Sequence, residues 1–265
     1  MLIVTHPDFL SEANRLADHH RLADGMTVVV ATNQEIYNEF SSGSPDVSAI
    51  RNFVKMLYQK PEGSGKLKYV LLFGDGSYDY KDHLAKNTNY VLAFETFESQ
   101  NMVFSTATDD FYGLMDPLEG NDAFGFIDLG IGRFPVDDID EARSMVDKCI
   151  FYASGAPKNM GEWRNSICFI ADDEDSNTHI RQVEDQVTPG IEKNHSLYNI
   201  DKIYLDAYTQ ISTSSGARYP EVNKRINEEV EKGVLLLNYT GHGGETGWAT
   251  ESILTLNDIN SWTKK

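Results

Sequence analysis

The sequence has few of the residues that several classes of protein require. Its two cysteines, Cys149 and Cys168, are too few for a disulfide framework, although a single bridge between them stays open. No apolar run reaches the ~18 residues typical of a membrane-spanning helix. The first residues, MLIVTHPDFL, lack the basic start and the cleavage site of a signal peptide. We therefore expect a chain that either is cytosolic or belongs to a longer protein.

Basic residues are also scarce, since 23 Lys and Arg face 41 Asp and Glu and the formal net charge is -18. Such a surface repels nucleic acid and anionic lipid headgroups, which excludes nucleic acid as a partner. It suits cations such as calcium, or basic peptides, although solubility alone explains most of these charges. The sequence has no H-E-x-x-H pair and no G-x-S-x-G elbow, so neither a zinc hydrolase nor a serine hydrolase is favoured.

What the chain does contain is an alternation of apolar runs with helical patterns. The first half predicts strands over 2–7, 26–32 and 68–79. Helices are predicted between them, over 9–23 and 46–59. Asp46 is a plausible N-cap for the helix over 46–59. This order predicts a parallel sheet covered by helices on both faces.

A looser, acidic region over 88–130 and a long helix over 137–154 follow. The small-residue segment 154–163 is the expected linker, which divides the chain into an N-terminal α/β subdomain, 1–155, and a second α/β subdomain, 156–265. The second half predicts strands at 165–173, 202–208 and 234–240. Its helices are expected over 177–193 (limited by Pro189 and Gly190), over 219–233, and from 254 onward.

Three of these strands end in residues that could carry chemistry. Asp75 lies in Gly-Asp-Gly, the acids 172–174 follow the strand over 165–173, and His242 lies between glycines after the strand over 234–240. Ligands in parallel sheets bind beyond the carboxyl ends of strands. If the last two strands are neighbours, an acid and a histidine meet in one crevice. The histidine would be a general base, or merely part of a glycine-rich turn.

The residues alone provide no nucleophile for this histidine. Cys168 lies in the middle of a predicted strand, and Cys149 lies on the apolar face of a predicted helix. Both cysteines are therefore expected to be buried and inert.

Several segments, in order and over nearly the whole chain, resemble the gingipain-type cysteine peptidases. VLLLNYTGHGGETGW resembles the histidine motif of that family, and KYVLLFGDG resembles an earlier strand and its Gly-Asp turn. TDDFYGLMD, IDLGIGRFPVDDIDEARSMVDKCIFYA and ICFIADDED resemble three further blocks. The resemblance implies an α/β caspase-like three-layer sandwich with mostly parallel sheets and two subdomains. The insertion LEGNDAFGFID (118–128) is similar to the PorU-like branch, the surface peptidases or sortases of type IX secretion in Bacteroidetes.

The resemblance also implies roles for individual residues. His242 matches the catalytic histidine, the backbone N–H of Gly243 matches an oxyanion donor, and Glu174 matches the acid that supports the histidine, with Asp173 as the alternative. Substrate contacts are implied at Glu245, Trp248 and Ser176. No acid aligns at Ser176 or Asn177, where the family has its substrate-pocket acid.

The family nucleophile is a cysteine at the end of the next strand, which places it beyond Lys265. The resemblance implies an endopeptidase or sortase that cleaves secreted cell-surface polypeptides. It also implies association with outer-membrane secretion machinery, and location at the surface of a Gram-negative bacterium. The fragment itself is expected to be inactive. A non-catalytic surface or adhesion module with the same fold is the alternative. No cofactor is required, but Asp75 and Asp79 could hold a structural Ca²⁺. The alternative that the residues favour is a solvated acidic face.

Overall fold

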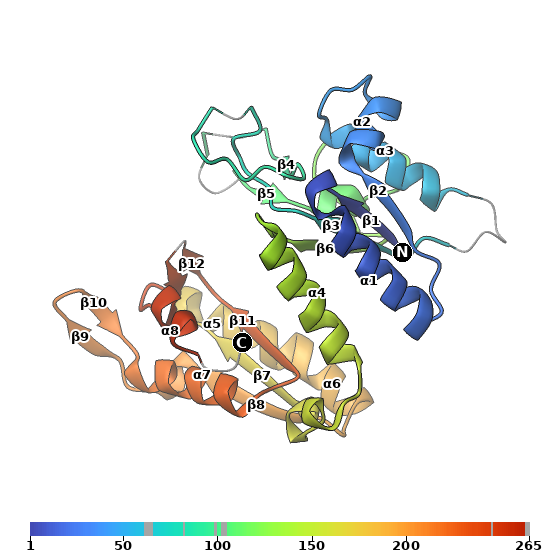
Figure 1. The fold of residues 1–265 in the computed structure, drawn as a ribbon. Helices are drawn as coiled ribbons and strands as arrows, with labels where there is room; N and C mark the ends of the chain where they lie inside the picture. Colours follow the sequence, from blue (N-terminus) through green and yellow to red (C-terminus); the bar gives the residue numbers. More distant parts are fainter. Residues whose placement is uncertain (61–65, 82, 98–99, 102–104, 245, 263–265) are drawn as a thin grey trace. The chain divides into compact units, whose positions relative to one another are not determined.

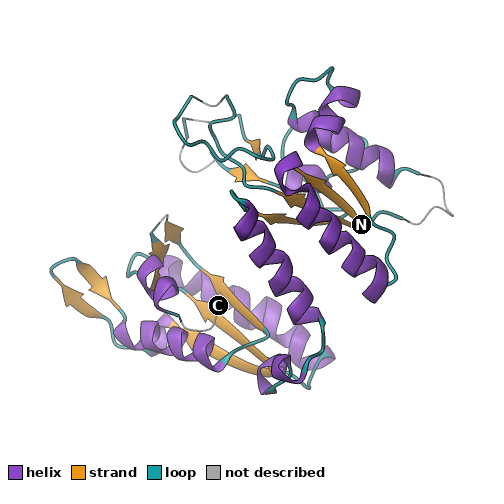
Figure 2. Cartoon of the chain, viewed as in Figure 1, coloured by secondary structure: helices purple, strands orange, loops and turns teal. Residues whose placement is uncertain are grey.

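The computed structural model describes residues 1–60, 66–81, 83–97, 100–101, 105–244 and 246–262 (Figures 1 and 2). The chain divides into two compact units, Met1–Gly155 and Ala156–Lys265, and the division falls inside the segment 154–163. Each unit is an α/β sandwich and is described by itself. No helix in the described ranges is both long enough and apolar enough to span a membrane.

The first unit is organised around a four-stranded parallel sheet with strand order β2-β1-β3-β6. The strands are β1 (Leu2–Thr5), β2 (Val29–Thr32), β3 (Tyr69–Phe73) and β6 (Gly130–Phe134). The helices are α1 (Leu10–Ala23), α2 (Asn33–Phe40), α3 (Val47–Tyr58) and α4 (Ile139–Ala153). A two-stranded ribbon, β4 (Phe94–Glu95) with β5 (Ala107–Thr108), lies in the looser region.

Alternating side chains of the central strands build two separate cores. Leu2 and Leu72 face the cluster that contains residues of α2 and α3. Ile3, Leu71 and Phe73 face the cluster that contains residues of α1 and α4. Because successive strand residues point to opposite faces, strands buried on both sides need continuous apolar runs. This is why the sequence over β1 and β3 is apolar at nearly every position.

Helix caps explain where several helices begin. The Asp46 carboxylate accepts a hydrogen bond from the backbone N–H of Ser48, as the sequence predicts. Helix α2, which the sequence analysis does not predict, begins at a capping box in which Thr32 and Glu35 bond each other's backbone. The Thr-x-x-Glu spacing was the available signal for that helix.

Arg133 on β6 links three chain segments, at Gly74, at Val91 and Leu92, and at Asp109. Its guanidinium donates two hydrogen bonds to the Asp109 carboxylate, at 2.8 and 2.7 Å, and others to the backbone oxygens of Gly74, Val91 and Leu92. A paired, mostly buried guanidinium of this kind satisfies several loop carbonyls at once. The Ile-Gly-Arg-Phe block therefore has a structural role here.

The second unit contains a three-stranded parallel sheet with strand order β11-β7-β8 (Figure 1). The strands are β7 (Ser166–Ala171), β8 (Asn199–Tyr204) and β11 (Leu236–Thr240). The helices are α5 (Glu174–Arg181), α6 (Thr188–Asn194), α7 (Pro220–Lys232) and α8 (Leu256–Ser261). Two small antiparallel sheets consist of β9 (Ile211–Thr213) with β10 (Gly216–Arg218), and of β12 (Gly243–Gly244), β13 (Gly247–Trp248) and β14 (Leu254–Thr255).

The helix predicted over 177–193 is found close to its predicted start but contains a π-helical turn. Although α5 is assigned from Glu174, Asp175–Asn177 have left-handed dihedrals, so regular right-handed helix follows Asn177; a π-helical turn covers Gln182–Val187, and α6 continues to Asn194. Pro189 does not limit the helix, because it lies in the first turn of α6, where its missing N–H costs no hydrogen bond. Short 3₁₀ turns complete the described structure at Pro7–Phe9, Asp110–Gly113, Pro157–Asn159, Glu162–Asn165 and Leu205–Ala207.

We predict that the core beside β7 dominates the stability of the second unit. Ile170 is fully buried among residues of α7 and β8, so Ile170→Ala should lower the free energy of unfolding by about 2–5 kcal/mol. Leu197→Ala, at a position that is 88% exposed in the same unit, should cost no more than about 0.5 kcal/mol. Chemical denaturation of both variants measures the difference, and equal losses would contradict this assignment of the core.

Candidate active site

The carboxyl ends of β7 and β11 lie side by side, which confirms the neighbouring placement that the sequence left conditional. The strands are parallel, and Ala171 pairs with Thr240 in the last register position. The residues after both strands consequently emerge at the same edge of the sheet. This edge brings the acids after β7 to the histidine after β11.

Asp172 holds these two strand ends together. It is fully buried, and its carboxylate accepts hydrogen bonds from the backbone N–H of His242 (3.2 Å) and of Glu174 (3.3 Å). The Tyr239 hydroxyl donates its proton to the backbone oxygen of His242 at 2.6 Å and lies 3.4 Å from the same carboxylate. Burial, followed by the nearby negative charge of Asp172, raises the pKa of Tyr239 above its ordinary value. The Asp172 carboxylate therefore organises the backbone on both sides of the edge.

A left-handed turn aims the next acid at the histidine. Asp175, Ser176 and Asn177 have φ values of 54°, 57° and 60°, a conformation that non-glycine residues seldom adopt in succession. In this turn the Asp175 carboxylate lies 2.8 Å from the His242 Nε2 atom. Strain of this kind persists only where surrounding contacts hold it, and it is typical of functional sites.

The acids named by sequence reasoning occupy different positions around the ring. The nearest Glu174 carboxylate oxygen is 3.9 Å from His242 Nε2, so Glu174 is a second, longer-range partner. The Asp173 carboxylate instead accepts a hydrogen bond from the Tyr219 hydroxyl at 2.7 Å. Asp175, which sequence reasoning did not name, makes the short contact. The geometry favours Asp175 over Asp173 as the partner of the imidazole.

His179 is a further residue that the sequence analysis missed. It lies four residues after Asp175 on α5, its Nε2 atom is 3.6 Å from the Asp175 carboxylate, and its ring meets that of His242 edge to face with centroids 5.2 Å apart. No helical spacing predicts this contact, because Asp175–Asn177 are left-handed and Asp175 does not share a regular helical face with His179.

Gly241 is required where the two strand ends meet. A methyl group on its Cα would lie 2.4 Å from the Asp172 Cβ atom and 2.4 Å from the Tyr239 hydroxyl. Gly243 and Gly244 lie exposed in β12, and added methyl groups there would meet no close atom. Position 241 therefore requires glycine for a steric reason. Gly243 and Gly244 leave the imidazole of His242 uncrowded.

The residues expected to contact substrate lie around this edge. Trp248 stacks on Tyr239, with ring centroids 4.7 Å apart and planes at 6°, so it also packs the base of the site. Ser176 is exposed within the left-handed turn, and neighbouring Asn177 donates a hydrogen bond to the Asp206 carboxylate at 3.1 Å. Glu245 lies outside the described residues. Substrate contact at these positions stays a prediction.

Neither cysteine of the chain can serve His242. Cys168 is buried in the middle of β7 against the core of α7, and burial raises the pKa of its thiol to about 12. Cys149 is half-buried on α4 in the first unit, and burial raises the pKa of its thiol too. A nucleophile requires an accessible thiolate, so both cysteines are structural.

The geometry of the first unit gives little support for calcium at Asp75 and Asp79. One oxygen of Asp75 accepts a hydrogen bond from the Thr88 hydroxyl, and one oxygen of Asp79 accepts one from the backbone N–H of Leu84, both at 2.6 Å. Hydrogen bonds from the backbone N–H groups of Leu84 and His83 lower the pKa of Asp79. Calcium needs six to eight oxygen ligands, and these oxygens are partly engaged already. The calcium site stays a prediction.

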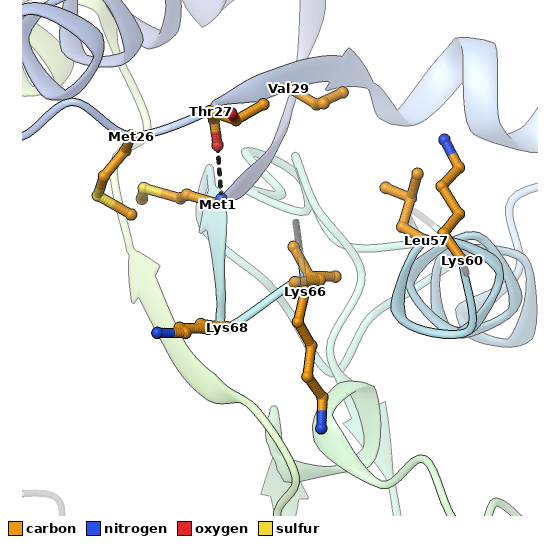
Figure 3. Close-up of a pocket in the computed structure, with 9 residues that line it drawn as sticks. Met1, Met26, Thr27, Val29, Leu57, Lys60, Lys66 and Lys68 are labelled. Carbon is orange, nitrogen blue, oxygen red and sulfur yellow. Dashed lines mark hydrogen bonds between the residues drawn. The ribbon is translucent and has the colours of Figure 1, made fainter. Parts of the chain in front are cut away.

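A separate pocket of about 310 Å³ in the first unit does not contain any of these residues (Figure 3). It lies beside β1 and β2 and is lined by Lys60, Lys66 and Lys68 together with apolar side chains. The Met1 amine donates a hydrogen bond to the backbone oxygen of Thr27 across one wall, at 2.8 Å. Nothing in this lining resembles the acid–histidine arrangement of the second unit.

Parallel sheets covered by helices, with an acid-supported histidine at a strand end, define an α/β protein of the caspase-like class. The model of peptidase family C25 matches residues 1–265. The chain therefore belongs to peptidase family C25, which confirms the gingipain-type resemblance.

Individual relatives agree with this assignment. Gingipain R2 of Porphyromonas gingivalis is 30% identical over 204 residues, which are 77% of this chain and 23% of that protein. Gingipain R1 of the same species is 30% identical over 77% of this chain and 17% of its own length. The chain thus spans less than a quarter of these relatives.

Two solved structures share the fold. Dimeric latent PorU from Porphyromonas gingivalis matches 97% of this chain and 20% of its own chain, with 31% identity and a TM-score of 0.51. The complex of Porphyromonas gingivalis RgpB pro- and mature domains matches 95% of this chain and 50% of its own chain, with 24% identity and a TM-score of 0.57. The predicted caspase-like fold and the likeness to PorU are confirmed.

We expect that position 241 does not tolerate a side chain, because Asp172 and Tyr239 lie close to the Gly241 Cα atom. Gly241→Ala should lower the free energy of unfolding by about 1–3 kcal/mol, because Asp172 and Tyr239 must move to admit the methyl group. Gly244→Ala is the matched control, since open space surrounds its Cα, and its effect should stay within about 0.5 kcal/mol. Thermal and chemical denaturation compare the two variants. A neutral Gly241→Ala would show that the strand ends are not held as described.

Glu251 should make stability depend on pH. Burial raises the pKa of this carboxyl, and the charges of Asp172, Glu174 and Asp173 raise it further. The folded state therefore holds the proton more tightly than the unfolded state. The resulting stabilisation is present below the ordinary glutamate pKa and is lost as pH rises through the folded value.

The variant Glu251→Gln tests this, because it removes the charge while its amide oxygen can still accept the hydrogen bond from Gln210. The free energy of unfolding of Glu251→Gln, relative to wild type, should increase between about pH 4 and about pH 8. Glu192→Gln, at an exposed position of α6, is the control and should show no such trend. A flat difference for Glu251→Gln would refute the raised pKa.

Proposed function

We propose that this chain is the histidine-bearing part of a cysteine endopeptidase in which His242 is the general base. The observation that carries the proposal is the 2.8 Å contact between His242 Nε2 and the Asp175 carboxylate at the joined ends of β7 and β11. Membership of peptidase family C25 supports the reaction class.

The contact with Asp175 assigns a task to each ring nitrogen. An ionised carboxylate can only accept a hydrogen bond, so Nε2 carries the proton and Nδ1 keeps its lone pair. Nδ1 is then the atom that can accept a proton from a thiol. The His242 side chain is 49% exposed, which leaves this nitrogen open to a partner. Asp175 both orients the ring and stabilises the imidazolium that forms.

The proposed reaction is acyl transfer through a cysteine that follows Lys265 in the full-length protein. His242 Nδ1 takes the thiol proton, the thiolate attacks the peptide carbonyl carbon, and the backbone N–H of Gly243 donates to the oxyanion. The imidazolium then returns the proton to the leaving amine as the C–N bond breaks. Water or another amine finally takes the acyl group from sulfur, which makes the outcome hydrolysis or transpeptidation.

We infer polypeptides as the substrates. The likeness to PorU supports a role at the cell surface of a Gram-negative bacterium, in the processing of secreted proteins by a type IX secretion system, with sortase activity as one form of it. The excess of acid in the chain is compatible with basic peptide segments as substrates. No residue preference at the cleavage point is proposed.

One observation favours the alternative, a non-catalytic surface or adhesion module. Both cysteines of the chain are structural, so the proposed reaction depends on a residue outside it. The reading frame after Lys265 discriminates the two: a cysteine at the end of the next apolar strand supports the peptidase, and its absence supports the binding module.

Replacing the proposed base should separate activity from folding. In the full-length protein, His242→Ala should lower the rate of peptide cleavage by about 10²–10⁴-fold, the usual contribution of a general base. Its melting temperature should stay close to that of wild type, since the ring is half exposed. His195→Ala, at an exposed position after α6, should leave the rate unchanged. Retained cleavage by His242→Ala would rule out its role as base.

A further inference from the structure

We infer that Asp175, His179 and His242 form a binding site for a divalent transition metal ion, with Zn²⁺ as the ion that fits best. Each residue offers one ligand atom, and the three atoms lie within 4.8 Å of one another. Two residues come from α5 and the third from the end of β11. No other cluster of three or more metal-ligating side chains occurs in the part of the chain that the structure describes.

The separations between the donor atoms suit a tetrahedral ion. Ligands bound to Zn²⁺ at about 2.0–2.1 Å lie roughly 3.3 Å apart in a tetrahedral site. The Asp175 carboxylate is 2.8 Å from His242 Nε2 and 3.6 Å from His179 Nε2, which brackets that spacing. The third separation, between the two histidine nitrogens, is within 4.8 Å. Three protein ligands with one position left for water or another ligand are common in zinc sites.

His179 is the residue that protein contacts alone leave unexplained. Its side chain is only 17% exposed, and neither buried ring nitrogen has a hydrogen-bond partner among the described residues. A buried imidazole without partners is costly, and such groups call for an explanation. A metal ion between the two rings would satisfy one nitrogen of His179 directly. The same ion would neutralise part of the charge of Asp175.

The surrounding charges and the donor types select the class of ion. Glu174 lies 3.9 Å from His242 Nε2 and can add a fourth donor, which would be the second oxygen. Asp172, Asp173 and Glu251 are close enough to influence one another electrostatically, so the edge attracts cations. Two imidazoles favour Zn²⁺ or its transition-metal neighbours, whereas Ca²⁺ and Mg²⁺ favour oxygen alone.

The consequence for activity rests on the proposed function. A metal bound to Nε2 of His242 occupies the nitrogen that otherwise carries the proton. The ring stays neutral, so the proton of Nε2 is passed to water while Nδ1 takes one up from water, and the metal-bound imidazole carries its single proton on Nδ1. Nδ1 can no longer accept a thiol proton. The metal would therefore inhibit cleavage reversibly, by locking the histidine in the wrong tautomer.

Titration of the 265-residue chain with Co²⁺ tests the site without any measurement of activity. Binding should produce the visible absorption bands of four-coordinate cobalt at one ion per chain, and Zn²⁺ should displace them while Ca²⁺ should not. His179→Ala should weaken binding by at least the ~10–100-fold typical of losing even an outer-shell partner. His195→Ala, in the same unit, is the matched control and should bind as wild type does.

Circular dichroism establishes that each variant is folded, and Asp175→Asn replaces His179→Ala if the latter does not fold. The absence of cobalt bands in wild type, or bands that persist unchanged in the folded ligand variants, would overturn the proposed site.

A second arm separates this inference from the proposed function. In the full-length protein, Zn²⁺ should inhibit cleavage, and His179→Ala should require at least about tenfold more Zn²⁺ for half inhibition. If cobalt binds but wild type cleaves no peptide, the peptidase proposal fails and the metal site stands. If zinc saturates the site while cleavage continues, the inhibitory role is wrong.

Discussion

The buried carboxylate of Asp172 is the constraint on which the site depends. It accepts hydrogen bonds from the backbone that follows β7 and from the backbone that follows β11, so one side chain links both strand ends. A buried carboxylate is stable only when such donors surround it. The absence of a side chain at Gly241 allows the two ends to approach closely enough for this. The hydrogen bonds of Asp172 thus depend on the absence of a side chain at Gly241.

Negative charge is concentrated around this arrangement, and it has two effects. Two of the acids that follow β7, Asp175 and Glu174, lie 2.8 and 3.9 Å from the His242 Nε2 atom, so negative charge faces the imidazole directly. The charges of Asp172, Asp173 and Glu174 also disfavour a further negative charge nearby. Together with burial, they raise the pKa of Glu251. Such a concentration of negative charge favours cations near this edge of the sheet.

Much of the fold could be predicted, because burial on both faces imposes a visible pattern on a sequence. The apolar runs over β1, β3 and β7 predict buried parallel strands, and Asp46 predicts the start of α3. Helix α2 was missed although its Thr-x-x-Glu cap was visible. The helix after β7 was misjudged because proline is a breaker inside a helix but is tolerated in a first turn, and tertiary packing chose the second case at Pro189.

The sequence by itself determined the principal strands of both sheets, the family, and the glycine-flanked histidine at a strand end, since each of these follows from periodicity or from a local motif. Only the tertiary structure decided which carboxylate meets the imidazole. Three consecutive residues take a left-handed conformation that their types disfavour, and this turn directs Asp175 rather than Asp173 toward His242. The same turn brings His179 beside them. Side-chain direction at a strand end depends on backbone dihedrals that distant contacts impose, and no local pattern encodes them.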